Sequence, residues 1–147
     1  MKEPADDGIL ALARNLSPKV LWLPALVLLT YILACLLGVT ERLPWIDKVF
    51  HPVGGYAIAY CVSRSLEMLA TRGASPRLGG ALRAGFIISM TATAALFWEF
   101  AEFAVDSGLA MRFQTDLTDT MSDMALGLVG GIIFLALHRR AAAGGHT

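Results

Sequence analysis

Charged residues are scarce in this chain of 147 residues. Only 16% of the residues are Asp, Glu, Lys or Arg, and they balance to a formal net charge of zero. Hydrophobic residues make up 56% of the chain, against roughly 45–50% in a typical soluble domain. The composition therefore indicates an integral membrane protein in a lipid bilayer. The absence of a basic stripe argues against a nucleic-acid partner.

Cysteines and short catalytic motifs are also few. Cys35 and Cys61 both lie inside apolar runs, so we expect two buried free thiols. No Gly-x-Ser-x-Gly elbow is present, which argues against a serine hydrolase of that kind. No glycine-rich phosphate loop is present either.

Long apolar segments predict the fold. Four of them cover residues 20–39, 49–70, 82–105 and 120–137. The first has twenty residues without a charge, about 30 Å as a helix, which matches the hydrocarbon core of a bilayer. The segment 1–17 has apolar residues on one helical face, which predicts a short amphipathic helix at the membrane surface. We therefore predict a single all-α domain over residues 1–147, a four-helix transmembrane bundle.

The start of the second span has two interpretations. Pro52 suits a first helical turn, which would place His51 at or next to the N-cap. Alternatively, the helix begins near Pro44 and kinks at Pro52.

Two glycines mark a packing face on the last span. Gly127 and Gly131 form a GxxxG pattern, which allows close approach of helices in lipid. A homo- or hetero-oligomer through this face is an open alternative to packing within the chain.

Lysine and arginine are unevenly divided between the two faces of a four-span arrangement. One face would carry Lys2, Arg14, Lys19, Arg72, Arg77, Arg83, Arg139 and Arg140. The other would carry only Arg42, Lys48 and Arg112. By the positive-inside rule, we predict that both termini are cytoplasmic.

Half of the acidic residues fall between residues 97 and 123. They form two groups with the spacing i, i+3, i+7, which places three carboxylates on one helical face. The groups are Glu99, Glu102 and Asp106, and Asp116, Asp119 and Asp123. The uncharged runs beside them, residues 84–98 and 124–137, reach only about 21–23 Å, short of the roughly 30 Å hydrocarbon core. We therefore expect the nearest acids to lie within the membrane near its outer face.

We predict that these side chains hold a divalent metal ion. A carboxylate at the centre of a membrane helix costs on the order of 2.5–3.5 kcal/mol unless it is protonated, paired or bound to metal. The predicted ligands are His51, Glu99, Glu102, Asp119 and Asp123, and the predicted supporting residues are Asp47, Asp116 and Gln114. Oxygen ligands with one imidazole suit Mn²⁺, Fe²⁺, Zn²⁺, Mg²⁺ or Ca²⁺. Taken singly, Asp116, Asp119 and Asp123 are explained equally well as N-cap or first-turn residues.

Three short motifs carry a family resemblance. They are Asp47-Lys48-Val49-Phe50-His51, Trp98-Glu99-Phe100-Ala101-Glu102-Phe103, and Gln114-Thr115-Asp116-Leu117-Thr118-Asp119 with Asp123-Met124 and Gly130. Over roughly residues 47–130 the chain resembles the YjdF-like proteins, a family of small bacterial inner-membrane proteins of unknown function, and more distantly the VanZ-like proteins. The resemblance implies a bacterial inner-membrane location and brings no established activity.

The leading hypothesis is a metal-binding membrane protein. One form of it is a metal-dependent enzyme that acts on a lipid-linked or envelope substrate, although the sequence identifies no catalytic residue. A proton or ion relay, or transport, through intramembrane carboxylates is the first alternative. A structural subunit of a larger membrane complex is the second.

Overall fold

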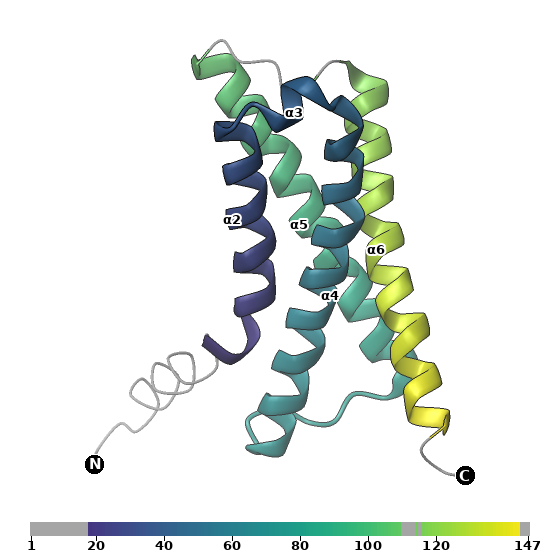
Figure 1. Cartoon of the computed structure of the whole chain (residues 1–147). Coiled ribbons are helices and arrows are strands. Elements are labelled where there is room, and N and C mark those ends of the chain that lie inside the picture. The colour runs from purple at the N-terminus through teal and green to yellow at the C-terminus, as the bar shows by residue number, and fades with distance from the viewer. Residues whose placement is uncertain (1–17, 110–113, 115, 145–147) are drawn as a thin grey trace.

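The computed structural model describes residues 18–109, 114 and 116–144. Every regular element in these residues is a helix (Figure 1). The elements are α2 (Trp22–Leu36), α3 (Val39–Arg42), the 3₁₀ helix η1 (Pro44–Ile46), α4 (Asp47–Thr71), α5 (Gly80–Leu109) and α6 (Leu117–Gly144). The all-α prediction is confirmed for this part of the chain. The surface helix predicted for residues 1–17 lies outside the described residues.

The four long helices lie side by side, with α4 contacting each of the other three (Figure 1). The acids of α5 and α6 lie at the end of the bundle that also carries α3 and the start of α4. This end is called the acidic end below. The turn between α4 and α5 lies at the opposite end, which is called the basic end. The bundle thus brings segments far apart in the sequence to the same level.

Two of the helices have the length and composition of membrane spans. These are α5 over Gly80–Gly108 and α6 over Leu117–His138, with 29 and 22 residues. In α5 only 11% of the most apolar stretch is buried inside the protein, and in α6 only 28%, so neither is the covered core helix of a soluble protein. α4 has 25 residues but is less apolar, and α2 is apolar but has 15 residues, about 22 Å. Four spans therefore remain a prediction.

α2 is shorter than the predicted span over residues 20–39, for local reasons at both ends. Pro24 has no N–H to donate to the carbonyl of Val20, and the regular helix begins only at Trp22 after a bend at Leu21. At the other end Gly38 adopts a left-handed conformation with φ 66° and donates its N–H to the carbonyl of Cys35, which is a common way for a helix to end.

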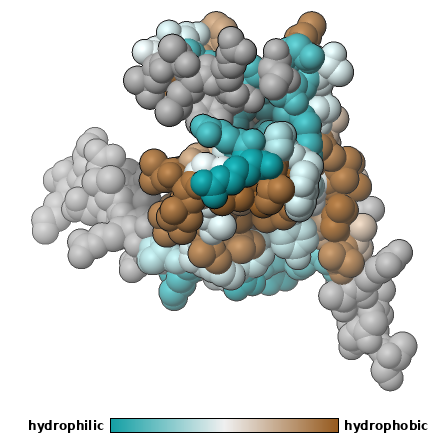
Figure 2. Space-filling model, turned by 45° about the horizontal axis from the view of Figure 1, so that its top comes forward, coloured by the Kyte–Doolittle hydropathy of each residue, from teal (hydrophilic) through white to brown (hydrophobic). Residues whose placement is uncertain are grey.

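Large hydrophobic side chains cover the outside of the bundle. Leu29 of α2 is 64% exposed, Phe97 of α5 is 64% exposed and Ile132 of α6 is 55% exposed. Figure 2 shows hydrophobic residues along the flanks and hydrophilic ones gathered toward the acidic end. In water each exposed Å² of this surface would cost about 25 cal/mol, whereas in lipid it costs nothing comparable. The surface therefore fits a bilayer.

Glycines allow the central helices to approach closely. A Cβ on Gly55 of α4 would lie 1.9 Å from the carbonyl oxygen of Gly127 in α6. A Cβ on Gly130 would lie 1.9 Å from the carbonyl oxygen of Pro52. The tightest contact between α4 and α6 thus uses Gly55 and Gly130. Gly127 and Gly131, the predicted pair, are also buried within the chain: a Cβ on either would meet α5, and the carbonyl of Gly127 faces Gly55 of α4.

α4 begins earlier than the predicted span. It starts at Asp47, directly after η1, and contains Pro52 in its interior. His51 therefore lies in the second turn of the helix and not at the N-cap. The alternative in which helical structure begins near Pro44 agrees better with the structure.

Candidate metal centre

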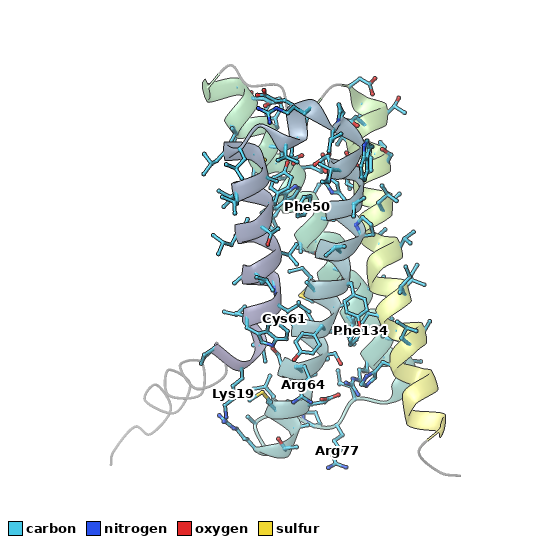
Figure 3. The ribbon with its side chains drawn as sticks, in the orientation of Figure 1. Lys19, Phe50, Cys61, Arg64, Arg77 and Phe134 are labelled. Atoms are coloured by element: carbon cyan, nitrogen blue, oxygen red, sulfur yellow. The ribbon has the colours of Figure 1, made fainter. Side chains whose placement is uncertain are left out.

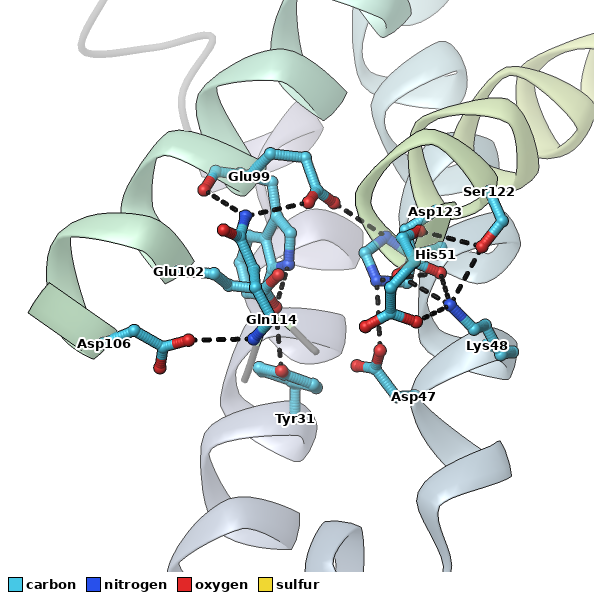
Figure 4. Close-up of polar contacts among 12 residues, drawn as sticks. Tyr31, Asp47, Lys48, His51, Glu99, Glu102, Asp106, Gln114, Ser122 and Asp123 are labelled. Carbon is cyan, nitrogen blue, oxygen red and sulfur yellow. Dashed lines mark hydrogen bonds and ion pairs between the residues drawn. The ribbon is translucent and has the colours of Figure 1, made fainter. Parts of the chain in front are cut away.

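Five titratable side chains from three helices converge near the acidic end of the bundle (Figure 4). They are Asp47 and His51 of α4, Glu99 and Glu102 of α5, and Asp123 of α6, and they are called the buried cluster below. Asp47 and His51 are four residues apart in α4, and Glu99 and Glu102 are three apart in α5, so each pair shares a helical face. His51, Glu99, Glu102 and Asp123 are each 9% exposed or less. Water therefore has little access to these charges.

The imidazole of His51 lies at the centre of the cluster. Its Nε2 is 3.5 Å from Oδ2 of Asp47 and 3.6 Å from Oδ1 of Asp123. Its Nδ1 is 3.9 Å from Oε1 of Glu99. Two sets of three residues each bring one ligand atom per residue within 4.8 Å of the others. The first set is His51, Glu99 and Asp123, and the second is Asp47, His51 and Glu102. These side chains could hold a metal ion.

Three buried polar atoms of the cluster make no hydrogen bond with the described residues. They are Oδ1 of Asp47, Nε2 of His51 and Oε1 of Glu99. A buried polar atom without a partner typically costs about 1–3 kcal/mol, and more when it is charged. Three such atoms at one place mark a site that could hold a further group.

Glu102 is held in position by two aromatic side chains. Its Oε1 accepts a hydrogen bond from the hydroxyl of Tyr31 at 2.9 Å and another from Nε1 of Trp98 at 2.8 Å. The rings of Tyr31 and Trp98 also pack edge to face, with centroids 5.0 Å apart. Tyr31 is the one buried residue of α2, all of which is described. Glu102 therefore connects α2 to the cluster.

Gln114 orients Glu99 from outside the helix. Its side-chain nitrogen donates to the carbonyl oxygen of Glu99 at 2.9 Å and to Oε2 of the same residue at 3.1 Å. Its backbone N–H donates to Oδ2 of Asp106 at 2.9 Å. Asp106 thus holds the backbone of Gln114 and is no part of the buried cluster. These bonds leave Oε1 of Glu99 turned toward His51 (Figure 4).

Lys48 supplies a positive charge beside the cluster. Its Nζ donates to both carboxylate oxygens of Asp123 at 2.8 Å and to Oγ of Ser122 at 3.0 Å. It also forms an ion pair with Asp119. The side chain of Lys48 is 36% exposed, whereas that of Asp123 is 4% exposed. The ammonium group therefore closes the cluster on its more accessible side.

The structure brings together four of the five predicted ligands. His51, Glu99, Glu102 and Asp123 lie in the buried cluster, and Asp47, predicted to support them, lies close enough to be a ligand itself. Asp119 belongs to neither set of potential ligands and is engaged by Lys48. Asp116 is exposed, and its Oδ1 accepts a bond from the backbone N–H of Asp119 at 2.9 Å, in keeping with an N-cap.

Sequence reasoning missed the roles of three residues. Tyr31 and Trp98 hold Glu102, and Lys48 neutralises part of the charge on Asp123. A tyrosine within an otherwise apolar run is a signal that could have identified Tyr31, because a buried hydroxyl needs a partner. Lys48 lies outside the apolar runs, where no pattern marks a partner inside the bundle, but its position one turn before Pro52 and the reach of its side chain bring it to α6.

Comparison with known proteins places the chain in a family. A family model described as "Predicted membrane protein (DUF2238)" matches residues 9–143. This match agrees with the resemblance to uncharacterised YjdF-like membrane proteins. No curated protein and no solved structure matches the chain. The chain therefore belongs to the DUF2238 family of predicted membrane proteins.

Proposed function

We propose that this membrane protein binds a divalent metal ion in the buried cluster. The observation that carries the proposal is the pair of unpartnered atoms, Nε2 of His51 and Oε1 of Glu99, on side chains that are nine-tenths buried or more. One nitrogen of His51, one carboxylate oxygen of Glu99 and one of Asp123 lie within 4.8 Å of one another, close enough to share an ion. A cation there would give these atoms the partner that the protein does not supply.

The charge balance of the site supports a cation. Four carboxylates belong to the cluster, and Asp119 brings a fifth beside it. Against them the described residues supply the ammonium group of Lys48, and the imidazole of His51 adds a positive charge only when it is protonated. Burial disfavours like charges held together, so this excess of negative charge needs protons or a metal ion. A divalent ion would remove two negative charges and satisfy the unpartnered atoms at once.

The donor set narrows the choice of metal. Carboxylate oxygens with one imidazole suit Mn²⁺, Fe²⁺, Zn²⁺, Mg²⁺ or Ca²⁺. Neither Cys35 nor Cys61 belongs to a potential ligand set among the described residues. The hydrogen bonds from Gln114 to Glu99 and from Tyr31 and Trp98 to Glu102 are the kind that fix ligands in metal sites.

The proposal includes a topology. The chain would cross a bacterial inner membrane four times, and the buried cluster would lie near the outer face. Lys19, Arg64 and Arg77 lie toward the basic end, below Phe134, whereas Phe50 lies in the opposite half (Figure 3). The positive-inside rule places that basic end in the cytoplasm. A bound divalent ion would polarise a phosphoryl or carbonyl oxygen and activate water. The chain would thus be a metal-dependent enzyme on a lipid-linked or envelope substrate.

The alternative of a proton relay has less support from the packing. Below the cluster, Ala59 of α4, Ile87 of α5 and Phe134 of α6 form a buried apolar layer. Thr91 lies near this layer, but its hydroxyl is bonded to the carbonyl of Ile87 at 2.9 Å. The three side chains of this layer carry no group that could pass a proton on, so a relay across the bundle would have to pass beside them, where Tyr56 and Tyr60 pack.

Elemental analysis of the purified protein tests the proposal. Wild type prepared without chelators should hold about one equivalent of a divalent metal after resupply, and its thermal unfolding temperature should fall when the metal is removed, because a ligand that binds only the folded state stabilises it. Glu99→Gln and His51→Ala should each lower the metal content at least tenfold.

Glu67→Gln is the matched control, because it makes the same chemical change at the basic end, where Glu67 pairs with Arg64 and Arg83. It should leave metal content unchanged. Wild type that holds well under one equivalent, or equal metal content in all variants, would refute the metal site. The proton relay would then become the leading explanation of the cluster.

A further inference from the structure

A cavity of about 230 Å³ lies directly below the buried cluster. Its walls come from α2, α4 and α5, with Gly127 of α6 as a further contact. The cavity approaches the roughly 300–1,000 Å³ of small-molecule sites. It is long enough for part of an extended lipid chain, because the wall residues run from His51 to Ile58 on α4 and from Trp98 to Thr91 on α5. Seven residues of helix correspond to about 10 Å.

The surface of this cavity is hydrocarbon along its length. Its polar side chains are few, and three of them direct their polar atoms elsewhere. The hydroxyl of Tyr31 and Nε1 of Trp98 are bonded to Glu102, and the hydroxyl of Thr91 is bonded to its own helix. The fourth is His51, at the end nearest the cluster, and its Nε2 has no hydrogen-bond partner. The cavity is therefore apolar with a single polar end.

α2 forms the outer wall and is attached mainly at its two ends. At the acidic end Tyr31 binds Glu102 and packs on Phe50 and Trp98. At the other end Nε1 of Trp22 donates to the hydroxyl of Tyr60 at 3.3 Å. The backbone of α2 packs closely against α4 and has little close contact with the backbone of α5. The α2–α5 side is thus the side of the cavity that the protein closes least.

We propose that this cavity binds one hydrocarbon chain of a lipid whose anionic head group, a carboxylate or phosphate, lies at the buried cluster. The inference rests on the metal site proposed above, because that ion would provide the positive centre that attracts the head group. The apolar walls match the chain, the single polar end matches the head, and the surrounding bilayer supplies such molecules. The substrate of the proposed metal centre is then an amphiphile that enters from the membrane.

Gly54 offers a way to fill the cavity without disturbing the fold. It lines the cavity, and a Cβ built on it meets nothing within 4 Å. Gly54→Leu should therefore place a side chain in the space that the lipid chain would occupy. Gly85→Leu is the matched control, because Gly85 is exposed on α5 and its Cβ also meets nothing within 4 Å. Ala94→Leu fills the cavity from the α5 wall and provides a second test.

Photo-crosslinking in detergent with palmitic acid that carries a diazirine in its chain is the direct experiment. In wild type, labelling of Ile58 and Ala94 should exceed labelling of the exposed Phe97 at least fivefold. Gly54→Leu should lower labelling of the cavity walls at least fivefold, and Gly85→Leu should not. Unlabelled palmitic acid and a lysophosphatidic acid should both compete, which compares the carboxylate with the phosphate, and hexadecanol should compete at least fivefold less well.

Wall labelling no greater than that of Phe97, or equal in wild type and both cavity-filling variants, would overturn the proposal. So would labelling that appears only after residues 1–17 are removed, because the chain's own segment would then occupy the cavity. Equal competition by hexadecanol would overturn the anionic head group. Metal analysis of the same samples separates the two proposals. Labelled walls in metal-free wild type would refute the metal centre and the anionic head group that depends on it, and would leave only an apolar chain site. Metal without wall labelling would refute the lipid site alone.

Discussion

Adding one methyl group at Gly55 should separate the two central helices. The Cβ of Gly55→Ala would lie 1.9 Å from the carbonyl oxygen of Gly127 and 2.7 Å from its carbonyl carbon. Real contacts of this kind essentially never fall below 3.0 Å, so α4 and α6 would have to move apart by 1.1 Å or more. The obstacle is backbone, which cannot rotate away as a flexible side chain can.

The magnitude follows from two opposing effects. Overpacking a core typically costs about 1–3 kcal/mol, and the rigid obstacle places this substitution at the upper end. Replacing glycine by alanine within a helix returns about 1 kcal/mol. We therefore expect Gly55→Ala to lower the free energy of unfolding by roughly 2 kcal/mol, and its neighbour Gly54→Ala, which meets nothing within 4 Å, to be neutral or slightly stabilising.

Thermal unfolding in detergent, followed by a thiol-reactive dye that labels the half-buried Cys35 and Cys61 more fully as the bundle opens, measures the difference. Gly55→Ala should unfold roughly 5–10 °C below wild type, given a few degrees per kcal/mol for a chain of this size. Gly130→Ala should behave alike, because its Cβ would also lie 1.9 Å from backbone. A Gly55→Ala protein within 2 °C of wild type, or a Gly54→Ala protein that is equally destabilised, would refute the close approach of α4 and α6.

Two further predictions concern charge and orientation. Lys48→Met should lower stability by about 1–3 kcal/mol in metal-free protein, because the buried carboxylate of Asp123 loses its charged partner, and added divalent metal should restore most of that loss in a thermal unfolding assay. Equal losses with and without metal would show that Lys48 and the metal do not share Asp123. A reporter active only in the periplasm should give signal when fused after Gly108 and none when fused after Gly73, and the reverse pattern would contradict an outer-facing cluster.

Much of the fold could be predicted from hydropathy and helix signals. The apolar runs gave helices close to α4, α5 and α6, because a long and mostly apolar stretch has few other stable arrangements in lipid. The start of α4 could not be fixed in this way. Pro52 is compatible with a first turn and with an interior position, and the choice depends on η1 and on packing against Gly130.

The sequence could predict most of the residues that form the candidate site, but not which of them contact one another. Helical spacing and the depth argument identified His51, Glu99, Glu102 and Asp123. Whether Asp119 faces the cluster depends on the rotation of α6 about its axis, which the contact between Gly55 and Gly127 sets and which no local pattern records. The GxxxG pattern likewise pointed to the correct helix, whereas the most crowded positions are Gly55 and Gly130.

The attachment of α2 links the outer wall of the bundle to the chemistry inside it. One carboxylate oxygen, Oε1 of Glu102, accepts both the hydroxyl of Tyr31 and the indole N–H of Trp98. Any event that withdraws electron density from that oxygen weakens its hydrogen bond to Tyr31 of α2. Conversely, any movement of α2 changes the hydrogen bond that Glu102 accepts from Tyr31. By thermodynamic reciprocity the two effects have equal size. The position of α2 and the binding of a group at Glu102 are therefore coupled, and a change in either one shifts the other.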